Sequence, residues 1–171
     1  MLAAIDQFYG YELSIDGIIH EIETGQIDIA SLAQGQGGYS HPVVRLVDAL
    51  LSDGVHKFAS DIHFEPEGQF LRIRYRIDGV LRQVRVLHGR YWSAMLVRLK
   101  LVAGMNIAES RAPQDGRVSL SIAGRNVDFR AAVQPTIHGE NFVLRVLDAK
   151  RGIVDYDKLG LTDDQYHLLN L

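Results

Sequence analysis

Three side chains that could do acid–base or metal chemistry alternate along one short segment. Asp61, His63 and Glu65 stand at every second position, and such residues project to the same face of a sheet when the chain is extended. Two carboxylates and an imidazole on one face form a candidate acid–base or metal site. No fourth ligand stands nearby, and acids beside histidines are common on solvated faces, so the pattern favours a solvated face.

Arginines dominate the second half of the chain and point to anion binding. Residues 70–151 hold fifteen basic side chains, thirteen of them arginine, against six acids, whereas residues 1–69 hold eleven acids against two bases. Arginine is suited to bidentate contacts with carboxylates and phosphates. Arg117, Arg125 and Arg130 fall on one predicted hairpin, where guanidinium groups could stabilise charge on a transferring phosphoryl group. The alternative is internal pairing. For most of the arginines we expect pairing with the acidic segment, and for this hairpin the alternative is salt bridges to Asp128 and the acidic arm.

Several classes of chemistry have no signature in the sequence. Cysteine is absent, which excludes disulfides, thiolate metal sites and a cysteine nucleophile. The chain contains no G-x-S-x-G elbow, no G-x-x-x-x-G-K-[ST] phosphate loop and no G-x-G-x-x-G turn. No apolar run approaches the length of a membrane-spanning helix, so we expect a soluble segment.

The spacing of apolar residues predicts an α+β fold. The predicted helices cover 2–8, 13–23, from 42 to a stop at Gly54, and 90–103 with Gly104 as the C-terminal cap, and a capping box of Thr162 and Gln165 opens a further helix. The predicted strands cover 62–64, 71–77, 80–86, 117–122, 125–133 and 141–147. Residues 65–68 and 135–140 are predicted as loops, and Asp78-Gly79 as a hairpin turn. Because most of the connections are hairpins, we expect a mainly antiparallel sheet of about six strands with helices on one face.

Composition divides the chain into three parts. Residues 1–40 read as a helical arm that ends in a glycine-rich linker, and residues 41–150 as the α+β domain. Residues 151–171 read as a linker and the first helix of whatever follows.

Five motifs in this order resemble the secretion ATPase superfamily, and in particular the hexameric motors of type II secretion and type IV pilus assembly. The motifs are Ala59–Pro66 (ASDIHFEP), Arg74–Leu81 (RYRIDGVL), Pro113–Arg117 (PQDGR), Pro135–Glu140 (PTIHGE) and Val143–Asp148 (VLRVLD). The resemblance covers about residues 41–171. It implies that the α+β domain is the PAS-like N2 domain of such a motor. The family's phosphate loop would begin shortly after the helix opened by Thr162, so this chain would lack the RecA-like ATPase domain.

The resemblance also implies arginines near the ATP phosphates of a neighbouring subunit, and this sequence offers three candidates for them. Arg125 lies in the hairpin that matches the family's sensor-arginine region. Arg111 is a candidate in the loop where the family often reads Glu-Arg-Arg, but this sequence reads Glu109-Ser110-Arg111, so one arginine is missing. Arg117 is a further candidate because its loop matches well.

For the full-length parent, the resemblance implies an ATPase that uses ATP and Mg²⁺. The parent would form a homo-hexamer through its motor domain, lie in the cytoplasm at the inner membrane, and contact platform proteins of the secretion or pilus machinery. The fragment itself is expected to be inactive, to hold no cofactor and to bind no nucleic acid. The motifs leave secretion and pilus assembly open, with a pilus system such as the MSHA pilus preferred.

Two alternatives from other classes remain. A free-standing PAS-like sensor would show a saturable site for a small ligand in this chain. A nucleic-acid-binding domain would use the basic segment, and its affinity would fall steeply with salt.

Overall fold

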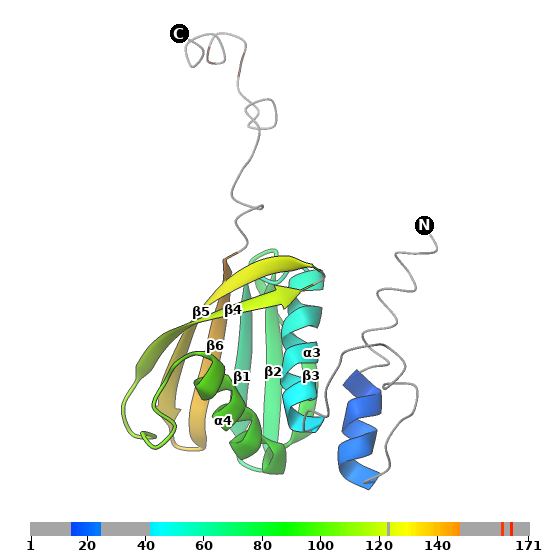
Figure 1. Ribbon diagram of the computed structural model, residues 1–171, viewed down its shortest axis with the longest axis vertical. Coiled ribbons are helices and arrows are strands. Elements are labelled where there is room, and N and C mark those ends of the chain that lie inside the picture. The colour runs from blue at the N-terminus through cyan, green and yellow to red at the C-terminus, as the bar shows by residue number, and fades with distance from the viewer. Residues whose placement is uncertain (1–14, 25–41, 123, 148–161, 163–164, 166–171) are drawn as a thin grey trace.

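Six antiparallel strands form a single sheet with helices against one face (Figure 1). The computed structural model describes residues 15–24, 42–122 and 124–147 together with Thr162 and Gln165. Its elements are α3 (Pro42–His56), β1 (Asp61–Glu67), β2 (Phe70–Ile77), β3 (Val80–His88), the 3₁₀ turn η1 (Gly89–Tyr91), α4 (Trp92–Val102), β4 (Gln114–Ile122), β5 (Arg125–Thr136) and β6 (Gly139–Leu147). The predicted α+β fold with helices on one face is confirmed.

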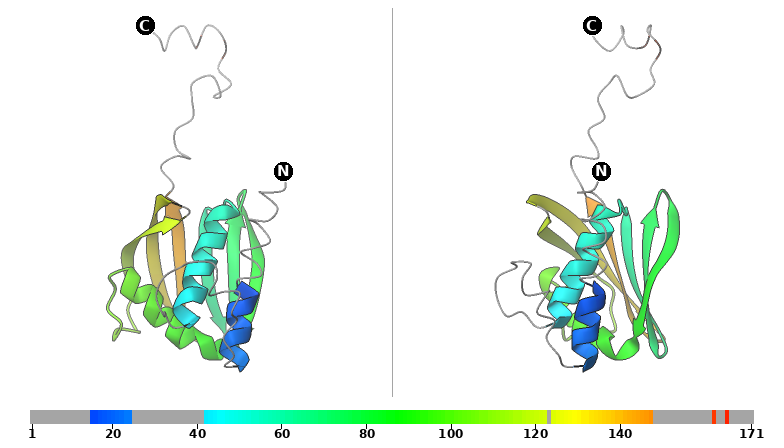
Figure 2. Two further views of the ribbon diagram at one scale, coloured as in Figure 1. Left: turned by 45° about the vertical axis from the view of Figure 1, so that its right-hand side comes forward. Right: turned by 90° about the vertical axis from the view of Figure 1, so that its right-hand side faces the viewer.

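The core lies between the sheet and the helices. Apolar residues alternate along the strands, so each strand turns one row of side chains towards α3 and α4 and the other row away from them. Fully buried side chains from both layers meet there, among them Leu46, Leu50, Ile62, Phe64, Ile73, Tyr75, Leu99, Phe129, Phe142 and Leu144. The right-hand view of Figure 2 shows the described helices on one side of the sheet only.

Residues 15–24 form a helix that packs against this core. Ile15 and Ile18 are buried in the same cluster as α3, and Glu21 forms a 2.5 Å ion pair with Arg45 of α3. The predicted helix over 2–8 and the glycine-rich linker lie outside the described residues, and the domain boundaries near 40 and 150 stay predictions.

The sheet consists of two three-stranded meanders joined in the middle. β1, β2 and β3 form one meander, β4, β5 and β6 form the other, and β1 pairs with β6 between them. The predicted turn at Asp78-Gly79 is present, with φ angles of 51° and 80°. Two consecutive positive φ values are typical of the type I′ turn that suits a tight hairpin.

Two segments predicted as loops, 65–68 and 135–140, are largely strand. Pro66 continues β1 beyond the end of its pairing with β6, and Pro135 continues β5 beyond the end of its pairing with β4. Each proline therefore has a neighbouring strand on one side only, and its missing N–H costs no hydrogen bond of the sheet. The prolines were predicted to lie in loops, but both strands continue through them.

Two helix ends follow the predicted local chemistry. Gly104 ends α4 with a φ of 67°, the left-handed conformation that glycine adopts readily. Gln165 Oε1 accepts a 3.1 Å hydrogen bond from the Thr162 N–H, one half of the predicted capping box.

Within the described residues, no helix has the length and apolarity that crossing a membrane requires.

Gly116 lies where β4 passes the end of α4. A Cβ atom at this position would collide with the backbone carbonyl oxygen of Ala103, which cannot move as a flexible side chain could. The glycine therefore allows close contact between α4 and the strand that carries Arg117.

We expect Gly116→Ala to lower the free energy of unfolding by about 1–3 kcal/mol, because the added methyl group overpacks a backbone contact. Urea denaturation followed by circular dichroism measures this. Ser121→Ala, an exposed position on the same strand, is the control and should change stability by less than about 0.5 kcal/mol. Equal effects of the two substitutions would show that the contact is not tight.

Candidate functional site

Acidic β1 and basic β2 neutralise each other on the face of the sheet that the described helices leave open. Arg72 pairs with Glu67 at 2.6 Å, and Arg74 with Glu65 at 2.7 Å. Arg76 lies 3.2 Å from Asp61. The expected internal pairing is therefore confirmed for the three arginines of β2.

The alternating acids and histidine do lie on one face, but ion pairs occupy them. Asp61 and Glu65 contact arginines, and His63 Nδ1 lies 3.6 Å from Glu65. No group of three or more potential metal-ligating side chains occurs in the part of the chain that the structure describes. Burial lowers the pKa of His63, and the nearby carboxylates of Glu65 and Asp61 only partly oppose this effect.

The lowered pKa of His63 makes stability depend on pH. In the unfolded chain histidine gains its proton near pH 6.5, whereas in the fold His63 stays neutral to a lower pH. Acid therefore favours the unfolded state below about pH 6.5. Between about pH 7.5 and about pH 5.5, the wild type should lose more stability than His63→Gln, measured as the urea midpoint. Equal losses would show that the environment of His63 does not shift its titration.

Three arginines follow one another across neighbouring strands in the other half of the open face. Arg117 of β4 lies directly opposite Arg130 of β5, and Arg130 lies opposite Arg145 of β6. Arg145 in turn lies opposite Asp61 of β1. Like charges directly opposite each other destabilise a sheet. We call Arg117, Arg130 and Arg145 the arginine row.

Two members of the arginine row have no counter-ion among the described residues. Arg145 donates a 3.0 Å hydrogen bond from Nε to Asp61 Oδ1. Within the described residues, neither Arg117 nor Arg130 has an ion pair or a side-chain hydrogen bond, and both side chains are exposed. Asp128, expected to pair with the hairpin arginines, instead accepts a hydrogen bond from Ser119 Oγ at 2.5 Å. Two adjacent uncompensated guanidinium groups suit an anion.

The arginine row lines a groove of about 440 Å³ on the open face. Four strands contribute to its walls: Asp61, Asp115, Gly116, Arg117, Arg130, Ala131, Ala132, Val143 and Arg145. Since neighbouring strands are about 4.8 Å apart, three arginines on successive strands span about 10 Å at the backbone. That span matches a chain of phosphoryl groups better than a single small anion.

The structure separates the three arginines predicted from the sequence. Arg117 lines the groove, but Arg125 and Arg111 do not. Arg125 has the strand parity of the core-facing Val127, which places it on the helix side of the sheet, opposite to Arg130. Contacts of Arg125 and Arg111 with a nucleotide stay predictions.

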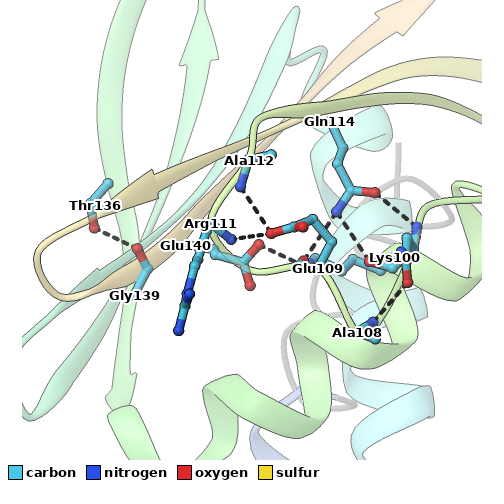
Figure 3. Close-up of polar contacts among 10 residues, drawn as sticks. Lys100, Ala108, Glu109, Arg111, Ala112, Gln114, Thr136, Gly139 and Glu140 are labelled. Carbon is cyan, nitrogen blue, oxygen red and sulfur yellow. Dashed lines mark hydrogen bonds and ion pairs between the residues drawn. The ribbon is translucent and has the colours of Figure 1, made fainter.

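Arg111 lies on a loop that a buried ion pair anchors (Figure 3). Lys100 Nζ lies 2.6 Å from Glu140 Oε1, although the two groups are not aligned for a hydrogen bond, and Lys100 also donates to the Glu109 carbonyl oxygen at 2.6 Å. The Glu109 carboxylate accepts hydrogen bonds from the backbone N–H groups of Arg111 and Ala112, which lower its pKa. The Arg111 side chain extends away from these contacts (Figure 3).

Glu140→Gln should lower the free energy of unfolding by about 3–5 kcal/mol, because it leaves the buried Lys100 ammonium without a counter-charge. Glu67→Gln is the matched control, since it breaks an exposed ion pair with Arg72 and should cost less than about 1 kcal/mol. Thermal or urea denaturation compares the two variants. A similar small loss for both would mean that water reaches the Lys100 ammonium.

Comparison with known proteins decides the family. Residues 37–170 match the family described as Type II/IV secretion system protein. This chain belongs to that family. It is 40% identical to the Type II secretion system protein E of Xanthomonas campestris pv. campestris over 164 residues, which cover 94% of this chain and 29% of the relative.

Two further relatives in this secretion family carry related names. The Type II secretion system protein E of Aeromonas hydrophila is 46% identical over 121 residues, and the Type II secretion system ATPase E of Vibrio cholerae serotype O1 is 44% identical over 121 residues. Each alignment covers 71% of this chain and 24% of the relative. The chain thus spans less than a third of the length of these relatives.

The resemblance to secretion motors is therefore confirmed at the level of the family. Two of the motifs that carried it, Pro113–Arg117 and Val143–Asp148, supply Arg117 and Arg145 to the same groove. Sequence reasoning did not single out Arg145. Only the register of β6 against β5 and β1 shows that it completes the arginine row.

Proposed function

We propose that this chain is the N2 domain of a hexameric ATPase that powers type II secretion or type IV pilus assembly. In this proposal, the arginine row contacts the phosphates of ATP held by the motor domain of a neighbouring subunit. The observation that carries the proposal is the pair of adjacent arginines, Arg117 and Arg130, that have no counter-ion among the described residues and face an open groove.

The groove is suited to complete a phosphate site rather than to form a whole one. It lies on an open sheet face, and the sequence has no phosphate loop to enclose a nucleotide. Guanidinium groups that meet the phosphates from a second surface can stabilise charge on the transferring phosphoryl group. ATP with Mg²⁺ would then be held by the motor domain, while this chain supplies only cationic contacts.

The proposed mechanism couples nucleotide state to domain position. The N2 domain would move as a rigid body against the neighbouring motor domain, and its arginines would reach the phosphates only when that interface closes. Closure would also exclude water, which strengthens the contacts between guanidinium groups and phosphate oxygens.

The pathway and the surroundings belong to the same proposal. The names of the relatives favour type II secretion, and pilus assembly, including the MSHA pilus, is the alternative. We propose a cytoplasmic protein that reaches the inner membrane through platform proteins of the machinery. Nucleic-acid binding has less support, because acids of β1 already pair with the arginines of β2.

The first test uses this chain and inorganic tripolyphosphate at low salt. Arg130→Ala should weaken binding by about tenfold or more, because it removes a charge-assisted contact. Arg72→Ala is the control, since it removes the same charge from the same face but from a residue already paired with Glu67. NMR titration gives the dissociation constants. Equal weakening by both variants would show that the arginine row contributes only general positive charge and no specific contact.

In the full-length protein, the proposal distinguishes the two sides of the sheet. Arg130→Ala should lower ATP turnover by at least about tenfold while changing the unfolding midpoint little. The sequence predicts the same for Arg125→Ala, whereas its place on the helix side of the sheet predicts a smaller loss. Steady-state hydrolysis decides between them, and normal turnover in Arg130→Ala would contradict the proposed role of the groove.

A further inference from the structure

The lining of the groove includes a negative charge, the carboxylate of Asp61, that an anion site would be expected to avoid. The side chain of Asp61 is only 8% exposed, and it lies at the point where β1, β2 and β6 come together. Its Oδ1 accepts the hydrogen bond from Arg145 Nε at 3.0 Å, and its Oδ2 accepts one from Ser60 Oγ at 2.9 Å. Arg76 Nε lies 3.2 Å from the same Oδ2.

The backbone around Asp61 holds this carboxylate in place. The Ser60 N–H donates to the Arg76 carbonyl oxygen at 2.8 Å, and the Val146 N–H donates to the Ser60 carbonyl oxygen at 2.9 Å. The residue before Asp61 is therefore bonded to both neighbouring strands. A carboxylate fixed in this way can determine the direction of the side chains that bind it.

Asp61 binds Arg145 through Nε and leaves the rest of the guanidinium group available. A guanidinium group has five N–H donors in a rigid plane, and four of them are on the two terminal nitrogens. The side chain of Arg145 is 69% exposed and lines the groove. No other side-chain partner of Arg145 occurs in the described part of the chain. Its terminal nitrogens are thus free to bind a ligand.

We propose that Asp61 is a positioning residue for the anion site. Its carboxylate holds Nε of Arg145, keeps this arginine beside Arg130 despite their repulsion, and directs the terminal N–H groups into the groove. The inference rests on the proposed function, because it assigns a role to Asp61 in the same phosphate-binding groove.

If Asp61 has no positioning role, Asp61→Asn is expected to change the affinity for an anion in the opposite direction. If Asp61 were only a nearby negative charge, Asp61→Asn would tighten the binding of inorganic tripolyphosphate. If Asp61 positions Arg145, the same variant should weaken binding by about fivefold or more, because an amide holds the guanidinium group less firmly than a carboxylate. Asp128→Asn is the control, since Asp128 is an exposed acid on the same face that binds Ser119. This control should tighten binding slightly or leave it unchanged.

A double-mutant cycle tests whether Asp61 acts through Arg145. Arg145→Lys keeps the charge but has no planar fork. We expect Asp61→Asn to have little further effect on tripolyphosphate affinity in the Arg145→Lys background. Additive effects of the two substitutions would overturn the positioning role, as would tighter binding by Asp61→Asn.

A second measurement separates this inference from the proposed function. In the wild type, the Nε–H NMR signal of Arg145 should exchange slowly with water because of its hydrogen bond to Asp61, and in Asp61→Asn it should exchange faster. If the wild type binds no tripolyphosphate, the proposed function fails, and the Nε–H signal still decides whether Asp61 holds Arg145. Unchanged exchange in a folded Asp61→Asn variant would overturn the inference.

Discussion

The pairing of β1 with β6 is the constraint on which the rest of the structure depends. These strands come from opposite ends of the α+β domain, and they join two meanders that are otherwise separate. Their register places Asp61 opposite Arg145 and Phe64 opposite Phe142. A shift by one residue would turn the apolar rows of one meander away from the helices. The same register therefore fixes both the core and the arrangement of charges on the open face.

Local sequence patterns were sufficient for the elements but not for their ends or their neighbours. Alternation identified β2, and helical spacing identified α3 and α4. Gly104 ends α4 as predicted, but the predicted stop at Gly54 was wrong, because α3 continues through this glycine to His56. Pro66 and Pro135 were misleading, because the free-energy cost of a proline in a strand depends on whether a neighbouring strand lies on its N–H side. That is a property of the assembled sheet. Nothing within a single strand contains that information.

In the candidate site, too, local patterns identify some residues, whereas others depend on the neighbouring strands. Arg117 was found because its motif is local, whereas Arg145 was missed because its importance depends on the strands beside it. Arg125 shows that period-two spacing can also separate residues. It lies an odd number of positions from Arg130 on the same strand, so the two face opposite sides of the sheet. The family match identifies the kind of protein, but the register identifies which arginines lie together.

The two faces of the sheet differ in the free-energy cost of exposing them to water. The helix side is apolar and buried, whereas the open face is made mainly of ion pairs and arginines that water solvates well. A partner that leaves the groove exposes mainly charged surface, so separation there carries no large hydrophobic penalty. Long-range attraction to the arginines accelerates encounter, and salt weakens this attraction. A surface of this composition is suited to contacts that form and break repeatedly, at a rate that the ionic strength of the surroundings controls.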